Sequence, residues 1–180
     1  MFKDTVTWIS GASSGIGEAL ACALAGEGAI PVLSARREEE LERVRARCLE
    51  LGAPDALVLP LDVTDETAMP PAVATVLERF GRIDTLINNA GISQRSLCVD
   101  TDMAVYRRLF EVDVIGQIAL TKAVLPVMLT QESGHIAVMA SVAGKVGAPY
   151  RTGYCAAKHA VMGFFDALRA EVAKRGVRVT

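Results

Sequence analysis

The chain carries near its N-terminus the segment Ser10-Gly11-Ala12-Ser13-Ser14-Gly15-Ile16-Gly17. A β-rich run at residues 5–9 precedes it, and a stretch rich in Ala and Leu extends from residue 15 to residue 28. Three glycines within eight residues permit a tight turn and a close approach of the backbone to its neighbours. A strand, a glycine turn and a helix in this order are typical of the start of a βαβ unit.

The alternation of strand-like and helix-like segments continues to the end of the chain. Apolar runs typical of strands occupy residues 30–35, 56–61, 83–87, 135–140 and 177–180, and patterns typical of helices occupy residues 38–51, 64–80, 102–130 and 152–174. This alternation predicts a doubly wound parallel α/β sheet, a Rossmann fold, in a single domain over residues 1–180. We expect the sixth strand to be central or nearly so, and the C-terminal part of the fold to be missing from the chain.

Prolines interrupt two of the predicted helices. Pro70 and Pro71 fall inside the helix predicted at residues 64–80, which we expect to begin on a Thr64 cap. A proline within a helix removes a hydrogen bond and bends the axis, and the sequence leaves this conflict open. Pro126 is expected to kink the helix at residues 102–130 in the same way.

Composition and charge exclude several classes of protein. Hydrophobic residues make up 51% of the 180 residues and charged residues 22%, as in an average soluble domain, and the net charge is −2. This balance argues against nucleic-acid binding, which needs a basic face. The unbroken apolar runs are far shorter than the roughly 18 residues of a membrane span, and the N-terminus has no signal-peptide pattern. Four cysteines without a C-x-x-C pair indicate reduced thiols, so we expect a cytoplasmic protein.

The histidines and the last helix give weaker signals. Neither His135 nor His159 has a second histidine or an acidic partner at ligand spacing, so no metal site is expected. The helix at residues 152–174 is apolar on more than one side over residues 161–168. Core packing and a helix-to-helix subunit interface explain this pattern equally well.

The glycine turn is suited to a dinucleotide. Gly11 permits the turn, Gly15 lets the backbone approach a pyrophosphate, and Gly17 allows the helix and strand to pack closely. The helix N-terminus supplies free N–H groups and a positive dipole end, and Ser13 and Ser14 add hydroxyl donors. The spacing is G-x-x-x-G-x-G rather than the commoner G-x-G-x-x-G. A plain glycine turn is the alternative.

The end of the second strand indicates which dinucleotide is bound. A carboxylate commonly stands there to bind the adenosine ribose, but this chain has Arg36 and Arg37 and no acid before Glu38. A guanidinium pairs with a 2′-phosphate through a planar, charge-assisted fork. We therefore expect NADP rather than NAD, the alternative being that both arginines only solvate the start of the next helix.

A second group of polar residues indicates catalytic chemistry. Tyr154 and Lys158 stand at i and i+4 and so share one face of a helix, where an ammonium stabilises a phenolate for proton transfer. Alone, such a pair is common on solvated helices. Ser141, 13 residues before Tyr154, and Asn88-Asn89-Ala90-Gly91 close the fifth and fourth strands at the carboxyl edge, where such folds bind ligands.

Together these motifs resemble the short-chain dehydrogenase/reductase superfamily, and within it the NADP-preferring carbonyl and ketosteroid reductases. The resemblance covers essentially all 180 residues, and residues 164–171 are most similar to the dehydrogenase/reductase member 7 group. It implies an oxidoreductase that interconverts a ketone or aldehyde and an alcohol by hydride transfer with NADP(H). It also implies a homodimer or homotetramer. Apolar candidates between residues 142 and 150 favour a hydrophobic substrate.

The resemblance also implies roles for individual residues. Ser141 orients the carbonyl, Tyr154 acts as general acid or base, and Lys158 assists Tyr154 and holds the nicotinamide ribose. Arg36 binds the 2′-phosphate. The residues expected to bind the cofactor are Ser10, Gly11, Ser13, Ser14, Gly15, Ile16, Gly17, Arg36, Arg37, Asp62, Val63, Asn88, Asn89, Ala90, Gly91, Tyr154 and Lys158.

Two departures from the family pattern bear on activity. Ser10 replaces the usual Thr and keeps the hydroxyl. Asp113 replaces a catalytic Asn; when ionised it accepts hydrogen bonds but does not donate them, and it adds a negative charge beside Lys158. A second hypothesis is therefore a dinucleotide-binding protein with impaired or no turnover. A third, an epimerase or dehydratase on the same fold, also uses the Tyr–Lys pair, but the glycine spacing argues against it.

Overall fold

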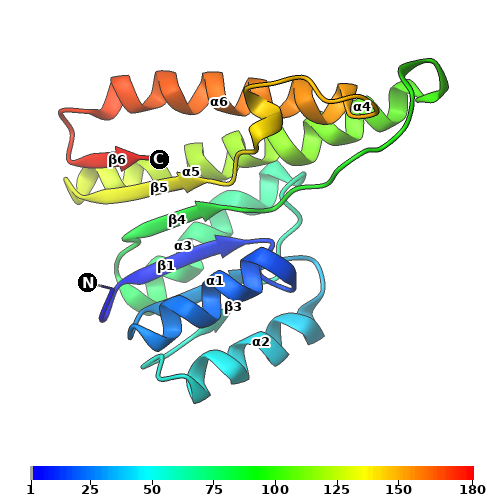
Figure 1. The fold of residues 1–180 in the computed structure, drawn as a ribbon. Coiled ribbons are helices and arrows are strands. Elements are labelled where there is room, and N and C mark those ends of the chain that lie inside the picture. The colour runs from blue at the N-terminus through cyan, green and yellow to red at the C-terminus, as the bar shows by residue number, and fades with distance from the viewer. Residues whose placement is uncertain (1) are drawn as a thin grey trace.

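The computed structural model describes residues 2–180 and shows a parallel sheet with helices on both faces (Figure 1). The strands are β1 (Val6–Ser10), β2 (Ile30–Ser34), β3 (Leu57–Val58), β4 (Thr85–Asn88), β5 (Gly134–Val138) and β6 (Val177–Val179). Their order is β3-β2-β1-β4-β5-β6, and every neighbouring pair is parallel. The direction of winding reverses between β1 and β4, and the carboxyl ends of these strands open the crevice in which such sheets bind ligands.

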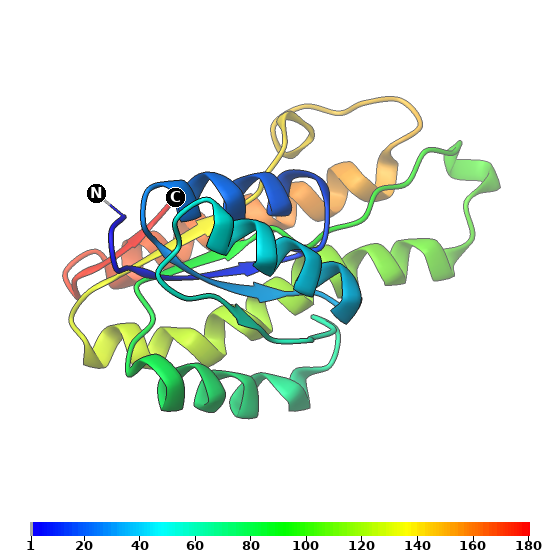
Figure 2. The same ribbon diagram turned by 90° about the horizontal axis from the view of Figure 1, so that it is seen from below.

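Helices cover both faces of the sheet. They are α1 (Gly15–Gly26), α2 (Glu38–Glu50), α3 (Met69–Phe80), α4 (Met103–Phe110), α5 (Gly116–Thr130) and α6 (Thr152–Val172). Short 3-10 turns occupy Glu66–Ala68, Cys98–Asp100 and Val142–Gly144, and a π-helical turn, Glu111–Ile115, joins α4 to α5. Figure 2 shows α1 and α2 on one face and α3 and α5 on the other.

Each face of the sheet has its own apolar core. Ile9 and Leu33 pack with residues of α1 and α2, whereas Trp8 and Leu86 pack with residues of α3, α5 and α6. Because successive side chains of a strand alternate between the faces, all five residues of β1 are buried. Burial on both faces explains why the strands are continuous apolar runs in the sequence.

The predicted doubly wound parallel sheet is confirmed, and two details differ. The third strand is limited to Leu57–Val58, and β5 ends at Val138 rather than at residue 140. Within the described residues β6 lies at the edge of the sheet, where it pairs with β5 alone, and the expected near-central position in a longer fold stays a prediction.

The conflict at Pro70 and Pro71 has a simple structural answer. Asp65, not Thr64, caps the segment, because its Oδ1 accepts a hydrogen bond from the N–H of Thr67 at 3.0 Å. The 3-10 turn that follows places both prolines in the first turn of α3. The N–H groups of that turn have no helical acceptor, so proline is tolerated there.

The helix predicted at residues 102–130 is interrupted at the π turn Glu111–Ile115, while Pro126 lies inside α5. Taken whole, Met103–Thr130 is long and apolar enough to cross a membrane, with a mean hydropathy of 1.6 in its most apolar window. Half of that window (50%) is buried inside the structure, and buried core helices pass the same test. The expectation of no membrane span therefore stays a prediction.

Candidate functional site

A cavity of about 400 Å³ opens at the carboxyl ends of β1, β2 and β4. The predicted cofactor residues that line it are Gly11, Ser13, Ser14, Ile16, Arg36, Arg37, Asp62, Val63, Asn89, Ala90 and Gly91. Residues that the sequence pattern did not single out complete the lining: Ala35, Leu61, Ile92, Arg108 and Val112. The glycine turn and the segments after β2, β3 and β4 thus meet around one space.

The glycines allow the turn its close packing. Gly11 has φ +69°, and a Cβ there would lie 2.9 Å from the Cα of Ala90. A Cβ on Gly17 would lie only 2.2 Å from the carbonyl oxygen of Gly11. At Gly15, with φ +60°, nothing lies within 4 Å of a Cβ position, so the backbone borders open space. No side chain of the described residues caps the N-terminus of α1, which leaves its first N–H groups available to an anion.

Ser10 and Asn89 tie the end of β1 to the end of β4. The Oγ of Ser10 accepts hydrogen bonds from the N–H groups of Asn89 at 3.0 Å and Ala90 at 3.1 Å. The Nδ2 of Asn89 donates to the carbonyl oxygens of Ser10 at 3.0 Å and Gly11 at 3.2 Å. Ser10 therefore belongs to the frame of the cavity rather than to its lining.

Other predicted cofactor residues also do not line the cavity: Gly15, Gly17, Asn88, Tyr154 and Lys158. Asn88 is fully buried, and its Nδ2 donates to the Oγ1 of Thr121 on α5 at 2.9 Å. That bond holds α5 against β4 and turns the Asn88 side chain away from the cavity.

The two arginines predicted to bind a 2′-phosphate lie at the cavity rim. The Nη2 of Arg37 donates hydrogen bonds to the hydroxyls of Ser13 and Ser14, both at 3.2 Å. Arg36 is exposed, lines the same cavity and makes no ion pair within residues 2–180. Two guanidinium groups therefore give this end of the cavity a positive charge.

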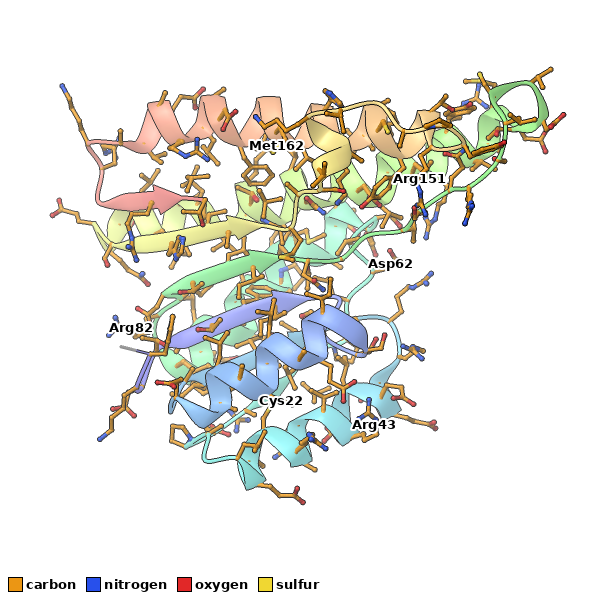
Figure 3. The ribbon with its side chains drawn as sticks, in the orientation of Figure 1. Cys22, Arg43, Asp62, Arg82, Arg151 and Met162 are labelled. Carbon is orange, nitrogen blue, oxygen red and sulfur yellow. The ribbon has the colours of Figure 1, made fainter. Side chains whose placement is uncertain are left out.

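Asp62 stands at the same carboxyl edge of the sheet (Figure 3). Its Oδ1 accepts hydrogen bonds from the N–H of Thr64 at 3.0 Å and from its hydroxyl at 2.8 Å. The Thr64 N–H is the main reason why the pKa of Asp62 is lowered, and the Thr64 hydroxyl, Arg108 and Arg36 lower it further. The carboxylate is thus ionised at neutral pH and held at the rim.

The predicted Tyr–Lys pair shares one face of α6. The Nζ of Lys158 lies 5.7 Å from the ring centroid of Tyr154, and it donates a hydrogen bond to the carbonyl oxygen of Met139 at 2.9 Å. The Lys158 ammonium is almost fully buried, whereas Tyr154 is half-buried. The contact with Met139 anchors the pair to the segment that follows β5.

Ser141 lies beyond the end of β5 and does not close the strand as expected. Its Oγ accepts a hydrogen bond from the N–H of Ala143 at 3.1 Å and caps the turn Val142–Gly144. That turn packs directly on α6, since a Cβ on Gly144 would lie 2.9 Å from the carbonyl oxygen of Lys158. The capped turn therefore brings Ser141 to the part of α6 that carries Lys158.

Asp113 lies on the π turn and is fully buried. Its Oδ1 accepts a hydrogen bond from the N–H of Ile92 at 2.7 Å, and its Oδ2 lies 3.5 Å from the Nζ of Lys158 without receiving a hydrogen bond. Burial raises the pKa of Asp113, against the lowering effects of the Ile92 N–H and of Lys158. The predicted position of this carboxyl beside Lys158 is confirmed, and the link to Ile92 at the cavity rim was not predicted.

The apolar residues expected to contact a substrate are exposed: Val142, Val146, Pro149 and Tyr150. Their role in substrate binding stays a prediction. Across residues 2–180, no group of three or more His, Cys, Asp or Glu side chains is arranged to hold a metal ion.

Known proteins resemble this chain in sequence. A family model described as short chain dehydrogenase matches residues 5–180. The human protein named dehydrogenase/reductase SDR family member 7 is 53% identical over 173 residues, which are 94% of this chain and 51% of that protein. The chain thus spans about half the length of the curated relatives it matches.

Solved structures share the fold. Levodione reductase has a TM-score of 0.95 at 36% identity, over 99% of this chain and 70% of its own. A short chain dehydrogenase/reductase from Burkholderia phymatum in complex with NAD and a metagenomic short-chain oxidoreductase in complex with NADP both have a TM-score of 0.94 at 30% identity. Each comparison covers 99% of this chain, with 64% and 81% of the two solved chains. With its strand order and glycine turn in agreement with these matches, the chain belongs to the short-chain dehydrogenase family.

Proposed function

We propose that the chain is the nucleotide-binding and catalytic part of an NADP(H)-dependent oxidoreductase that interconverts a ketone or aldehyde and an alcohol. One observation carries this proposal: Ile92 at the cavity rim, Asp113 and Lys158 form a continuous chain of contacts from the cavity to Tyr154. The names of the relatives, dehydrogenase and reductase, support an oxidoreductase acting on CH–OH groups.

The cavity fits a nicotinamide dinucleotide. Open backbone at Gly15 and the uncapped N-terminus of α1 suit a pyrophosphate, and two related structures hold NAD and NADP. The choice of NADP rests on Arg36 and Arg37, because a guanidinium fork matches a 2′-phosphate. The segment between β2 and Glu38 also lacks the carboxylate that would bind the ribose hydroxyls of NAD.

The residues of this chain would then have separate roles in the hydride-transfer reaction. When bound, the nicotinamide supplies or accepts the hydride. The hydroxyl of Ser141 holds the carbonyl oxygen, and the hydroxyl of Tyr154 donates a proton to that oxygen in reduction and takes it back in oxidation. The ammonium of Lys158, 5.7 Å from the ring centroid, stabilises the phenolate that remains.

Asp113 motivates a second candidate, a dinucleotide-binding protein without turnover. An ionised carboxylate 3.5 Å from the ammonium of Lys158 opposes the stabilisation that Lys158 gives to a phenolate. Because burial raises the pKa of Asp113, the neutral form of its side chain is favoured and this opposition is reduced. With Ser141, Tyr154 and Lys158 all present, the enzyme is the better-supported candidate.

The proposal also includes a hydrophobic carbonyl substrate, a cytoplasmic location and a homo-oligomer. The exposed apolar side chains at residues 142–150 support the substrate class, and the free cysteines support a reducing compartment. Val161, Phe165 and Leu168 are buried in the core, so packing accounts for most of the apolar character of α6. The half-buried Phe164 is available for a subunit contact.

Titration with NADPH and NADH, followed by nicotinamide fluorescence, tests the cofactor. Arg36→Ala is expected to weaken NADPH binding by about 1.5–3 kcal/mol, or roughly 10–150-fold, and to leave NADH binding nearly unchanged. Arg47→Ala, an exposed arginine of α2 outside the cavity, is the matched control. Equal losses for both nucleotides would contradict the assignment of Arg36 to the 2′-phosphate, and failure to reduce any carbonyl compound with bound NADPH would favour the second candidate.

A further inference from the structure

Arg151 differs from the other arginines of the described chain. Several arginines of residues 2–180 make no ion pair with another described residue. All of these are exposed except Arg151, which is half-buried. It immediately precedes α6, and Figure 3 shows it at the same edge of the sheet as Asp62. This position places a cation close to the site, in a part of the chain to which no role has been assigned.

Arg151 contacts both the Tyr154 ring and the loop at the cavity rim. Its Cζ lies 5.7 Å from the ring centroid of Tyr154. Its Nη1 donates a hydrogen bond to the hydroxyl of Ser93, which directly follows Gly91 and Ile92 in the cavity lining. The guanidinium therefore contacts both the ring of Tyr154 and a loop whose preceding residues line the dinucleotide cavity.

Arg151 makes few hydrogen bonds to other residues of the protein. A guanidinium has five N–H donors, and the bond to Ser93 is the one hydrogen bond that this side chain makes within residues 2–180. No carboxylate of those residues lies within 4.0 Å of it. The guanidinium thus keeps N–H donors and a positive charge that a small anionic ligand can pair with.

A purely structural role does not account for the guanidinium. The loop after β4 is already joined to the segment before α6, because the N–H of Ser96 donates to the carbonyl oxygen of Tyr150 at 3.0 Å. The same loop is braced internally by Gln94, whose Nε2 donates to the carbonyl oxygen of Ser96 at 3.1 Å. Fixing this loop therefore does not require the charge of Arg151.

We propose that Arg151 is a specificity-determining residue that binds a carboxylate of the substrate, which is then an amphipathic oxo acid. A guanidinium matches the two oxygens and single charge of a carboxylate in a planar, bidentate pair. The exposed side chains of Val146 and Tyr150 would contact the apolar body of the same molecule. This inference rests on the proposed function and adds a substrate class to it.

Calorimetric titration with 4-phenylbutanoate and 4-phenylbutanamide, with and without NADP⁺, tests the anion site without turnover. The two ligands have nearly the same shape and differ in charge. The unmodified chain is expected to bind the carboxylate at least tenfold more tightly, and Arg151→Gln to remove this preference. Arg151→Lys should keep part of it, and Arg95→Gln, which changes an exposed arginine of the loop after β4, should keep all of it.

Equal or absent binding of the two ligands to the unmodified chain would overturn the proposal, as would a carboxylate preference that survives Arg151→Gln.

A turnover assay with NADPH then separates this inference from the proposed function. The substrates are 4-oxo-4-phenylbutanoate and its methyl ester. The acid should be reduced with at least a tenfold higher kcat/KM than the ester, and Arg151→Gln should lower this ratio at least tenfold. Reduction of neither compound despite a carboxylate preference in calorimetry would support the anion site and contradict the oxidoreductase. Equal reduction of both compounds without a carboxylate preference in calorimetry would support the oxidoreductase and contradict the anion site.

Discussion

The end of the site proposed to bind phosphate (the phosphate end) is built from backbone and side chains at the rim, whereas the proposed catalytic end contains two buried side chains in contact. At the phosphate end, the glycine turn at residues 11–17 sets the path of the chain, and Arg36 and Arg37 extend from the rim. At the catalytic end, Asp113 is 0% exposed and Lys158 4%, with the Oδ2 of Asp113 and the Nζ of Lys158 3.5 Å apart. At the phosphate end, close packing around the backbone therefore limits which residues are tolerated. At the catalytic end, the free-energy cost of burying charge limits them.

The largest expected effect is at the catalytic end. Tyr154→Phe removes the proposed proton donor, and the kcat for carbonyl reduction should fall by about 10²–10⁴-fold, with a much smaller change in NADPH affinity. Steady-state kinetics and fluorescence titration measure the two quantities. Tyr106→Phe, which loses a hydroxyl bonded to Thr152 at 2.9 Å, is the control and should keep its turnover. Near-normal turnover in Tyr154→Phe would show that the proton donor does not lie at the catalytic end.

An intermediate effect is expected at the phosphate end. In Gly17→Ala the new Cβ would lie 2.2 Å from the carbonyl oxygen of Gly11 and 2.6 Å from the Nδ2 of Asn89, so the turn must move. The free energy of unfolding should fall by about 1–3 kcal/mol, measured in urea, and NADPH binding should weaken. At Gly26, in the same helix, no atom lies within 4 Å of a Cβ position, and Gly26→Ala should be neutral or stabilising by up to ~1 kcal/mol. Equal stability of the two variants would show that the turn is not held by packing.

The smallest expected effect concerns the buried charge. Because burial raises the pKa of Asp113, the folded chain holds this proton more tightly than the unfolded chain. Stability from this group is therefore complete below the ordinary pKa of 3.8 and is lost as pH rises through the folded value. Asp113→Asn stays neutral and keeps an acceptor for the Ile92 N–H. It should raise Tm at pH 7 by a few degrees, with a gain that shrinks as the pH falls toward 3.8.

Thermal unfolding at a series of pH values measures this effect, with Asp100→Asn, an exposed carboxylate after β4, as the control. A lower Tm for Asp113→Asn at pH 7 would show that the ion pair with Lys158 contributes more than the burial of the carboxylate costs. The two ends would then both be stabilised by their contacts, and the contrast between them would disappear.

The glycine turn, the parallel sheet and the Tyr–Lys pair were predictable because their signals are local. Glycine spacing sets the turn, the alternation of elements sets the sheet, and Tyr154 and Lys158 lie one helical turn apart. The contacts of Asp113 with Ile92 and of Arg151 with Ser93 join residues 21 and 58 positions apart, and no local pattern encodes them. The π turn was missed for a related reason, since one inserted residue barely changes the apolar periodicity of a long helix.

The two hydrogen bonds that the Asn89 amide donates affect the free energy of nucleotide binding. With the carbonyl oxygens of Ser10 and Gly11 already engaged, the loops after β1 and β4 keep their mutual position before any ligand arrives. Association then does not have to freeze this part of the backbone, so less of the binding free energy is lost to conformational entropy. The same amide withdraws two carbonyl lone pairs from the neighbourhood of an incoming anion. Asn89 thus acts before binding, as a preorganising and charge-masking group, without having to touch the ligand itself.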